Sequence, residues 1–558
     1  MQEQIKKIDI VDVPDGNQVF TKEFNDLLIE LHNQFSERIH DLLNKRRTVL
    51  DKAHTSNILP TLNPESIACA TNWSVLEVPK ELRTPGIEIS GPASQTSMFI
   101  NALNPGPDGD RAEGDLDDDE DSAGHTLEST VRAAINRRDA AKGVLSFVNE
   151  QRQRTYTLQE GNIPFFMHRE RGIHLFERQV QIDGEPISAA LLGTALTLSY
   201  CGEEQASKGQ GIYFYLPKLE SASEAALWKD VFDFMKLKLP FLQSTPIKAI
   251  PLIESLPAVF EMEEILYSLG EYAAGLNAAR WDLKASILEY VMTDPSQVWP
   301  DRFDVDIKTT PFLANIFRRL VAICLKHNAV AIGGMATALP SNNEEINDLA
   351  TKSITADKEW EANQGFIRAW VAHIFHMKTA AAPFKNLHHS NWIPSEDMHE
   401  PQNYPISIEV PEGNITSEGT RRNCRMLIEY IEGWLDGKGA KGIDSLQGKP
   451  GIRPALMEDL ATGRISVAQI AQRIIHQSID TETEFVHTTE SVKTVLQSEL
   501  TSILKESEPT DDATKTRYKT AYKVALRWIR NYIELDFRSL GSYSVAELIN
   551  LGHEDDAL

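Results

Sequence analysis

Short apolar runs alternate with helical stretches through the middle of the chain, and this alternation constrains the fold more than any other feature. We predict strands over residues 212–216, 248–253 and 329–335, and helices over residues 222–235, 259–269 and 312–326. Strands that alternate with helices at this spacing are typical of parallel βα units, because the helix returns the chain to the start of the next strand. Roughly 300 residues of this pattern favour an α/β protein with a TIM (β/α)8 barrel over a small doubly wound sheet.

Helical patterns flank this region on both sides. Apolar residues recur at helical spacing over 21–51, and further helices are predicted over 421–435, 465–475 and within 483–535. Residues 386–412 are rich in Pro, Asn, His and Ser and indicate a linker. We therefore predict an N-terminal helical clasp over residues 1–85, a TIM barrel with insertions over 86–385, and a C-terminal helical domain over 386–558.

The net charge of −25 argues against partners that are themselves negatively charged. It repels nucleic acid and anionic membrane surfaces, and no basic block offsets it. The four cysteines form no CxxC pair, which disfavours a thiolate metal site or a disulfide framework and fits a reducing compartment. Residues 1–13 lack an apolar core, the last four residues are not a peroxisomal signal, and no stretch is long enough to span a membrane. We expect a cytoplasmic protein that acts on small molecules and binds neither nucleic acid nor membranes.

Two carboxylates follow predicted strands. Glu254 comes directly after the apolar run 249–253, and Asp282 lies about one βα unit further along. In a parallel barrel both side chains would lie at the C-terminal rim on neighbouring strands, where barrel active sites form. Two carboxylates there suit Mg²⁺, with water and substrate as further ligands. The spacing alone leaves equally open that each carboxylate caps a following helix.

An arginine pair and an acidic run each have two interpretations. Arg169 and Arg171 follow the apolar run 163–167 and could hold a carboxylate or a developing oxyanion, although residue type alone favours a structural ion-pair cluster. Residues 108–121 are strongly acidic, and their composition favours a solvated loop. Their Asp spacing does not match an EF-hand.

Several blocks of the sequence together resemble the malate synthase family in its shorter, A-type form. They are collinear and cover nearly the whole chain, which makes the set specific although any single block is weak. The blocks are Tyr213-Phe214-Tyr215-Leu216-Pro217-Lys218, Leu252-Ile253-Glu254-Ser255-Leu256-Pro257-Ala258-Val259-Phe260, Gly275-Leu276-Asn277 with Arg280-Trp281-Asp282, Gly333-Gly334-Met335, Ala356-Asp357-Lys358 with Glu361-Ala362-Asn363, and Leu456-Met457-Glu458-Asp459 with Ala461-Thr462.

The resemblance implies a magnesium-dependent acyltransferase that condenses acetyl-CoA with glyoxylate in a Claisen-type reaction. The acyl group becomes an alkyl group, and hydrolysis of the thioester gives malate and CoA. Position by position, Glu254 and Asp282 match the magnesium ligands, Arg169 matches the catalytic arginine, and Asp459 matches the catalytic base. The resemblance thus implies Mg²⁺ as the cofactor and acetyl-CoA and glyoxylate as small-molecule substrates.

The resemblance also reassigns the end of the acidic run. Glu120 and Asp121 match an acidic pair near the metal, so these two residues are expected at the site rather than in a solvated loop. Four further residues are expected to support the site or contact substrate, with core packing as an equal alternative for the two tryptophans. They are Gly275, Leu276, Trp281 and Trp370.

Several blocks depart from the family pattern. Leu283-Lys284-Ala285 follow Asp282 where the family usually has Tyr-Ile-Phe, and residues 270–274 lack the basic residue and the His that usually precede Gly275. Residues 365–374 lose a Pro and a polar turn. The apolar run expected for the first barrel strand is replaced by Asp115-Leu116-Asp117-Asp118-Asp119. Because unpaired carboxylates inside a barrel are costly, this strand would be displaced, frayed or part of a reshaped site.

These departures leave two alternatives to malate synthase proper. One is a relative that uses another acyl thioester, including one bound to an acyl carrier protein, or another 2-oxo acid. The other is a catalytically inactive binding homologue. Retention of Arg169, Glu254, Asp282 and Asp459 argues against the inactive homologue, because a protein without catalysis has no physical reason to keep a costly acidic metal site.

Overall fold

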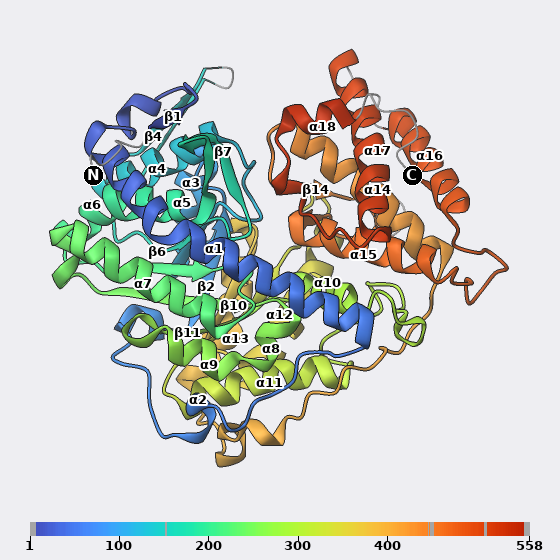
Figure 1. The fold of residues 1–558 in the computed structure, drawn as a ribbon, viewed down its shortest axis with the longest axis horizontal. Helices are drawn as coiled ribbons and strands as arrows, with labels where there is room; N and C mark the ends of the chain where they lie inside the picture. The colour runs from blue at the N-terminus through green and yellow to red at the C-terminus, as the bar shows by residue number, and fades with distance from the viewer. Residues whose placement is uncertain (1–6, 151–152, 445, 447–450, 507–510, 552–558) are drawn as a thin grey trace, which may run out of the picture.

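Eight parallel strands close into a barrel in the computed structural model, which describes residues 7–150, 153–444, 446, 451–506 and 511–551. Each strand pairs with the next barrel strand along the chain, and the last closes onto the first, so all eight C-terminal ends meet at one rim. The predicted TIM barrel is therefore confirmed (Figure 1). The barrel strands are β2 (Gly86–Gly91), β3 (Gly114–Asp118), β6 (Phe165–Arg169), β9 (Ile212–Leu216), β10 (Ile247–Ile253), β11 (Gly275–Ala278), β12 (Val330–Ala336) and β13 (Arg368–Val371).

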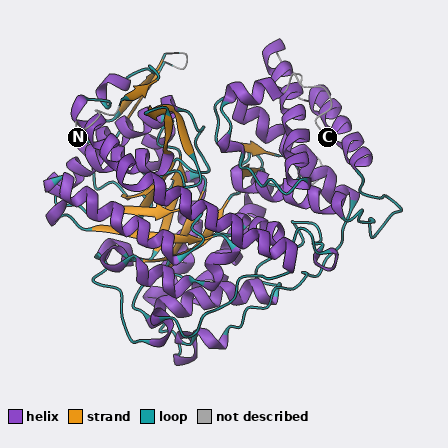
Figure 2. Cartoon of the chain, viewed as in Figure 1, coloured by secondary structure: helices purple, strands orange, loops and turns teal. Residues whose placement is uncertain are grey.

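Helices surround these strands, as the strand-helix alternation predicts (Figure 2). The predicted helix over 259–269 is instead two short helices, because Glu261 between them has a non-helical backbone (φ −118°, ψ 22°). The helices around the barrel are α3 (Thr96–Leu103), α4 (Leu127–Lys142), α5 (Ala189–Leu196), α6 (Gly202–Ser207), α7 (Ala222–Lys238), α8 (Leu256–Phe260), α9 (Met262–Ser268), α10 (Trp281–Tyr290), α11 (Pro311–Lys326), α12 (Glu344–Gln364) and α13 (Met377–His389).

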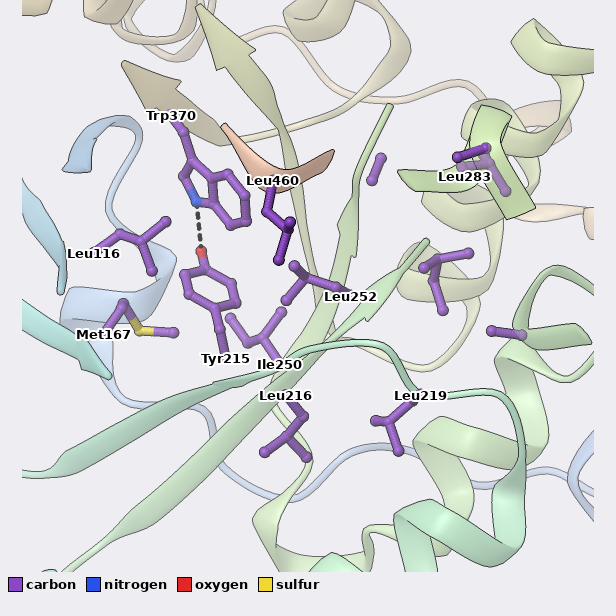
Figure 3. Close-up of a cluster of buried hydrophobic side chains, with 14 of the residues drawn as sticks. Leu116, Met167, Tyr215, Leu216, Leu219, Ile250, Leu252, Leu283, Trp370 and Leu460 are labelled. Atoms are coloured by element: carbon purple, nitrogen blue, oxygen red, sulfur yellow. Dashed lines mark hydrogen bonds between the residues drawn. The ribbon is translucent and has the colours of Figure 1, made fainter. Parts of the chain in front are cut away.

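Side chains from several strands fill the barrel interior beneath the rim (Figure 3). The buried carboxylate of Glu88 lies among them. It accepts hydrogen bonds from Tyr215 Oη (2.8 Å) and Trp370 Nε1 (3.1 Å) and forms an ion pair with Arg368 (2.6 Å). Because the carboxylate has partners on both oxygens, it fixes the orientation of Trp370 rather than leaving an unpaired charge in the core.

The acidic strand β3 is intact. It is the second barrel strand, since β2 precedes it, and it is paired along its length with both β2 and β6. The expectation of a displaced or frayed strand was therefore wrong. Successive side chains of a strand point to opposite faces, so Leu116 fills the interior while Asp117 faces the helix layer. There Asp117 forms ion pairs with Arg137 of α4 (2.6 Å) and with His168 (2.7 Å).

The solvated-loop interpretation holds only for the start of the acidic run. Asp108 and Asp110 are exposed, whereas residues 114–121 are all buried. Burial, together with the charge of Asp117, holds the pKa of Asp115 well above its usual range. The strand thus tolerates its acidic sequence in part through the ion pairs of Asp117.

A long helix dominates the N-terminal region. Helix α1 (Lys22–Ser56) packs across α5, α7 and α10 on the outside of the barrel (Figure 1). This region is not entirely helical, because β1 (Ile8–Ile10) pairs with β7 (Phe176–Ile182) in a sheet with β8 (Glu185–Ser188). Within the described part of the chain, we find no helix with the length and apolar character needed to cross a bilayer. The prediction of a cytoplasmic protein rests partly on the two ends of the chain. Of these ends, residues 1–6 and 552–558 lie outside the described residues.

A second group of helices follows the barrel, and Figure 1 shows it in orange and red at the C-terminal end. A two-stranded sheet at its edge is hydrogen-bonded to the barrel rim: Met457 N donates to Thr337 O (2.8 Å), and Leu339 N donates to Ala455 O (2.8 Å). The rim therefore fixes the position of the segment that precedes Asp459. The elements are α14 (Ser417–Leu435), β14 (Lys441–Ile443), β15 (Leu456–Glu458), α15 (Leu460–Ile475), α16 (Thr489–Glu506), α17 (Asp512–Ile533) and α18 (Val545–Leu551).

Candidate active site

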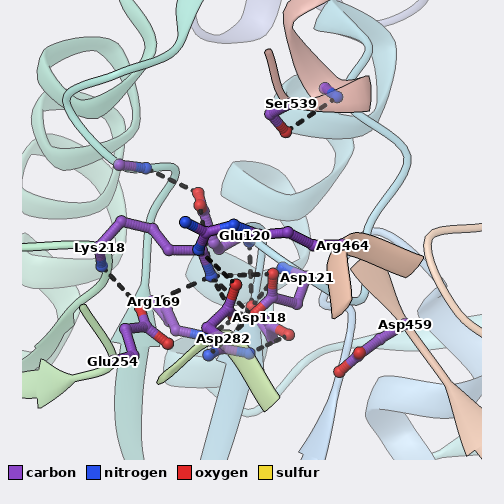
Figure 4. Close-up of polar contacts among 12 residues, drawn as sticks. Asp118, Glu120, Asp121, Arg169, Lys218, Glu254, Asp282, Asp459, Arg464 and Ser539 are labelled. Carbon is purple, nitrogen blue, oxygen red and sulfur yellow. Dashed lines mark hydrogen bonds and ion pairs between the residues drawn. The ribbon is translucent and has the colours of Figure 1, made fainter. Parts of the chain in front are cut away.

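Three buried carboxylates meet at the C-terminal rim of the barrel (Figure 4). Glu254 follows β10, Asp282 lies in the first turn of α10 after the neighbouring strand β11, and Asp121 follows β3. Each offers an oxygen atom, and these oxygen atoms all lie within 4.8 Å of one another. Three hard oxygen donors at this spacing fit Mg²⁺, which commonly takes a few carboxylates and completes its octahedron with water and substrate.

Neither predicted metal ligand caps a helix, so that alternative was wrong. Ser255 rather than Glu254 is the N-cap of α8, and its Oγ accepts from Ala258 N (3.3 Å). Asp282 lies inside α10, whose N-cap is Arg280. Both carboxylates are therefore available to the rim.

The ammonium group of Lys218 lies among these carboxylates. Its Nζ is 2.7 Å from Asp282 Oδ2, 3.1 Å from Asp121 Oδ1 and 3.6 Å from Glu254 Oε1. Burial raises the pKa of Glu254 to about 7 despite the attraction of Lys218, and the charge of Asp282 adds to the rise. Lys218 therefore places a positive charge where the three carboxylates converge. Sequence reasoning assigned no role to Lys218, although it ends one of the quoted blocks.

Arg169, the last residue of β6, points into the site. Its Nε and Nη2 form a two-point contact with Asp118 (2.7 and 2.6 Å), and its Nη1 is 3.2 Å from Asp121 Oδ2. Its guanidinium carbon lies 5.2 Å from the ring centre of Trp370. Arg171 instead pairs with Glu177 (2.8 Å) and does not contact the carboxylate cluster through that pair.

Glu120 lies at the edge of the carboxylate cluster. Its Oε2 accepts from Gly172 N (2.7 Å), and its Oε1 is 3.9 Å from Lys218 Nζ. Burial raises its pKa to about 8. Of the predicted acidic pair, Asp121 therefore joins the three-carboxylate group, while Glu120 borders it.

Asp459 starts the helix α15 and stands beside the cluster (Figure 4). Its Oδ1 accepts from Thr462 N (3.1 Å), and Thr462 Oγ1 accepts from Asp459 N (2.9 Å), which is a reciprocal N-terminal cap. Burial and the nearby charge of Asp121 hold the pKa of Asp459 well above its usual range. A carboxylate with a raised pKa is a stronger base for removing a proton from carbon.

Two cavities flank this arrangement. A mainly apolar cleft of about 290 Å³ is lined by Asp459 together with Met98, Met335 and Met457, and Lys438 is the one cation among its lining residues in the described chain. A second cavity of about 210 Å³ is lined by the metal-site carboxylates Glu254 and Asp282. Small ligands could therefore approach the site from two sides.

Arg464 of α15 bridges the C-terminal helices and the barrel, and sequence reasoning missed it. Its Nη1 donates to Asp282 Oδ1 (2.9 Å), and its Nε donates to Glu289 Oε1 (2.8 Å). It follows the block that carries Asp459 by a few residues, and that proximity was the signal available in the sequence.

The remaining predicted residues lie away from the carboxylates. Gly275 and Leu276 start β11, below the rim, and a Cβ atom on Gly275 would lie 2.0 Å from Val330 O. Gly275 therefore permits close strand contact rather than substrate contact. Trp370 packs in the barrel core under Arg169, and Trp281 lines a separate cavity.

Lys284, one of the residues at which the sequence departs from the family pattern, is buried beside Trp281. Its buried ammonium donates to Val305 O and lies 4.6 Å from the ring centre of Trp281. Burial, with the charge of Arg280, lowers the pKa of Lys284 to about 7.

Comparison with known proteins gives a family assignment. Residues 165–406 match the family model for the malate synthase TIM barrel domain, and residues 414–544 match the model for the malate synthase C-terminal domain. A malate synthase from Myxococcus xanthus is 38% identical over 469 residues, covering 83% of this chain and 82% of the relative. Malate synthase A from Escherichia coli is 36% identical over 464 residues, covering 82% of this chain and 83% of the relative. A malate synthase from Streptomyces clavuligerus is 34% identical over 543 residues, covering 95% and 96%. This chain belongs to the malate synthase family.

Proposed function

We propose that this chain is a malate synthase that condenses acetyl-CoA with glyoxylate and then hydrolyses the thioester to give malate and CoA. The observation that carries the proposal is the placement of Asp459 beside Arg169 and the carboxylate cluster at the barrel rim. These groups come from different parts of the chain, and each matches a role that the reaction needs. Family membership supports the same activity.

The first step needs a base and an oxyanion stabiliser together. The methyl group of an acetyl thioester is a very weak acid, so Asp459 can take its proton only if charge on the thioester oxygen is stabilised at once. Asp459 is suited to this because its environment raises its pKa. Arg169 is held in a fixed orientation by Asp118, which keeps its guanidinium positioned for the developing enolate oxygen.

Asp121, Glu254 and Asp282 would hold Mg²⁺, which when bound acts as a Lewis acid on the aldehyde of glyoxylate. The electron pair of the enolate carbon forms the new bond to the aldehyde carbon, and the resulting alkoxide takes up a proton. Water then cleaves the thioester and releases malate and the free thiol of CoA. We assign no residue to that hydrolysis.

The apolar cleft beside Asp459 fits the flexible arm of an acyl thioester. A protein-bound acyl carrier is less well supported, because carrier proteins of this kind are acidic and require a basic surface for docking. Lys438 is a lone cation among the cleft's described lining residues. The cytoplasmic location stays a prediction, and the relatives from Candida tropicalis and Gossypium hirsutum are named glyoxysomal.

The test is release of free thiol from acetyl-CoA in the presence of glyoxylate and Mg²⁺. We expect rapid release by the natural protein and a loss of roughly 100-fold to 10,000-fold in Asp459→Asn, because the amide cannot accept the proton. Asn still accepts a hydrogen bond at a helix start, so the fold should persist.

Asp511→Asn is a matched control for this test. Asp511 also caps a helix through a Thr three residues later, but it is exposed at the start of α17. Its rate should be unchanged. No thiol release by the natural protein with Mg²⁺ bound, or equal losses in the two variants, would refute the proposal.

A further inference from the structure

A cavity rich in cations lies next to the thioester cleft but outside the arrangement described above. It has a volume of about 260 Å³ and is enclosed by the start of α10, the segment before α11, the end of β12 and helix α12. Met335 and Thr337 line both this cavity and the cleft, so the two are neighbours across the end of β12. Its charged lining residues are Arg280, Lys284, Arg302, Lys308, Asp306 and Asp357.

Three of the four cations already have carboxylate partners. Arg280 forms an ion pair with Asp357 (2.9 Å), Lys308 lies 3.4 Å from Asp306, and Arg302 lies 3.5 Å from Glu458. The carboxylates that line the cavity are thus engaged, and Lys284 has no ion pair among the described residues.

Arg302 is 2% exposed and lacks acceptors for most of its donors. Its Nε donates to Asn423 Oδ1 (3.1 Å), while Nη1 and Nη2 have no hydrogen-bond partner among the described residues. Glu458 Oε2 is the nearest carboxylate oxygen, 3.5 Å from Nη2. Buried guanidinium donors without acceptors are costly, and an oxyanion is the ligand that supplies two acceptors at once.

Lys284 is the cation of this cavity without a carboxylate partner among the described residues. Its ammonium is 4% exposed, donates to a backbone carbonyl, and forms no ion pair within the described ranges. Trp281 lies near both cations, with Lys284 Nζ at 4.6 Å and Arg302 Cζ at 5.2 Å from the ring centre, but a ring offers no directional acceptor.

We propose that this cavity binds a small phosphate-type oxyanion between Arg302 and Lys284. The phosphate group comes from one of two sources: a free phosphorylated metabolite, or the phosphates of the CoA thioester that occupies the adjacent cleft. The chemistry of recognition is the same for both, namely bidentate contact with a guanidinium and a point charge from an ammonium. This site goes beyond the proposed function, and only the second of the two sources rests on it.

Isothermal titration with inorganic phosphate tests the site without turnover, at constant ionic strength set with chloride. We expect saturable binding by the natural protein and binding weakened roughly tenfold or more in Lys284→Ile, since a hydrogen bond to a charged group is lost. Ile is an apolar residue suited to this buried position, so Lys284→Ile should fold. Arg302→Lys keeps the charge but removes the two-point contact, and it should weaken binding as well.

Lys248→Ile is the matched control. Lys248 is also a buried lysine that donates to backbone carbonyls, Glu271 O and Ala273 O, but it lies on β10 and does not line this cavity. Phosphate binding should be unchanged in this variant. Repeating the titration with CoA present separates the sources: displacement of phosphate assigns the site to the thioester's own phosphates, and undiminished binding assigns it to a free metabolite. No saturable binding by the natural protein, or equal binding by Lys284→Ile, would overturn the site.

Discussion

The two faces of strand β3 carry acidic residues for different purposes. On the face toward the helices, Asp117 contacts Arg137 and His168, at 2.6 and 2.7 Å. On the face toward the barrel interior, Asp118 holds Arg169, and Asp121 just beyond the strand joins the carboxylate cluster. Both groups are buried, so burial of acidic residues does not by itself mark an active site.

The difference lies in how the carboxylate oxygens are arranged. In the outer group, the guanidinium of Arg137 lies among the carboxylates and contacts Asp117, Asp119 and Glu170. In the inner group, the oxygens of Asp121, Glu254 and Asp282 converge to within 4.8 Å of one another. Convergence of carboxylate oxygens on one point is the feature that indicates a metal site.

The largest effect that would test this comparison is on stability, from Arg137→Met. The substitution leaves Asp117, Asp119 and Glu170 without their shared guanidinium, so the free energy of unfolding should fall by about 3–5 kcal/mol. Denaturant unfolding measures this change, and thiol release per folded molecule should be unchanged. Arg138→Met is the control, because its partly exposed pair with Asp139 is expected to contribute about 1 kcal/mol or less. Similar losses in both variants would contradict a stabilising role for the outer group.

Arg169→Lys should lower the rate of catalysis rather than the stability of the protein, and its effect should be somewhat smaller than that of Arg137→Met. The positive charge remains, but the two-point contact with Asp118 is lost, so kcat should fall by roughly 100-fold to 1,000-fold. Steady-state thiol release measures this, and titration with Mg²⁺ should show that the metal still binds. Arg171→Lys is the matched control, since Arg171 pairs with Glu177 away from the site. A kcat unchanged by Arg169→Lys would remove this residue from the reaction.

The smallest expected effect is a pH dependence of stability from His168. Although burial opposes it, the ion pair with Asp117 raises the pKa of His168 to about 10 from an ordinary value near 6.5. A raised pKa means that the contribution is fully present below about 6.5 and is lost as the pH rises through about 10. The difference in unfolding free energy between the natural protein and His168→Gln should therefore shrink between those pH values. A difference that stays constant over this range would show that His168 is not charged in the folded protein.

Local patterns in the sequence were enough to predict much of the barrel. The run 212–216 coincides with β9, and the position of Glu254 and Asp282 after neighbouring strands correctly placed both at one rim. Strand β3 could not be predicted from its own residues. A carboxylate-rich segment can form a buried strand only where cations from other parts of the chain pair with it, and the local sequence does not show those cations. Arg137 and His168 are distant in the sequence, and no local pattern shows that they face Asp117.

The candidate site shows the same limit. The assignment of Asp121 depended on resemblance rather than on its own pattern, and Lys218 and Arg464 were missed because their roles arise from contacts between separate elements. The break between α8 and α9 was also missed, since it reflects the backbone conformation of one residue, Glu261.

Asp459 both caps α15 and is the base in the proposed reaction, and this double role restricts how the protein can be engineered. Helix caps are usual targets for stabilisation, because Ser, Thr, Asn and Asp exchange at modest cost. At this position any such exchange would remove the carboxylate, so selection for thermal tolerance and selection for turnover would act on one side chain in opposite directions. Libraries intended to raise the melting temperature should therefore hold Asp459 and Thr462 constant and vary other caps, such as Asp511, where stability alone is affected.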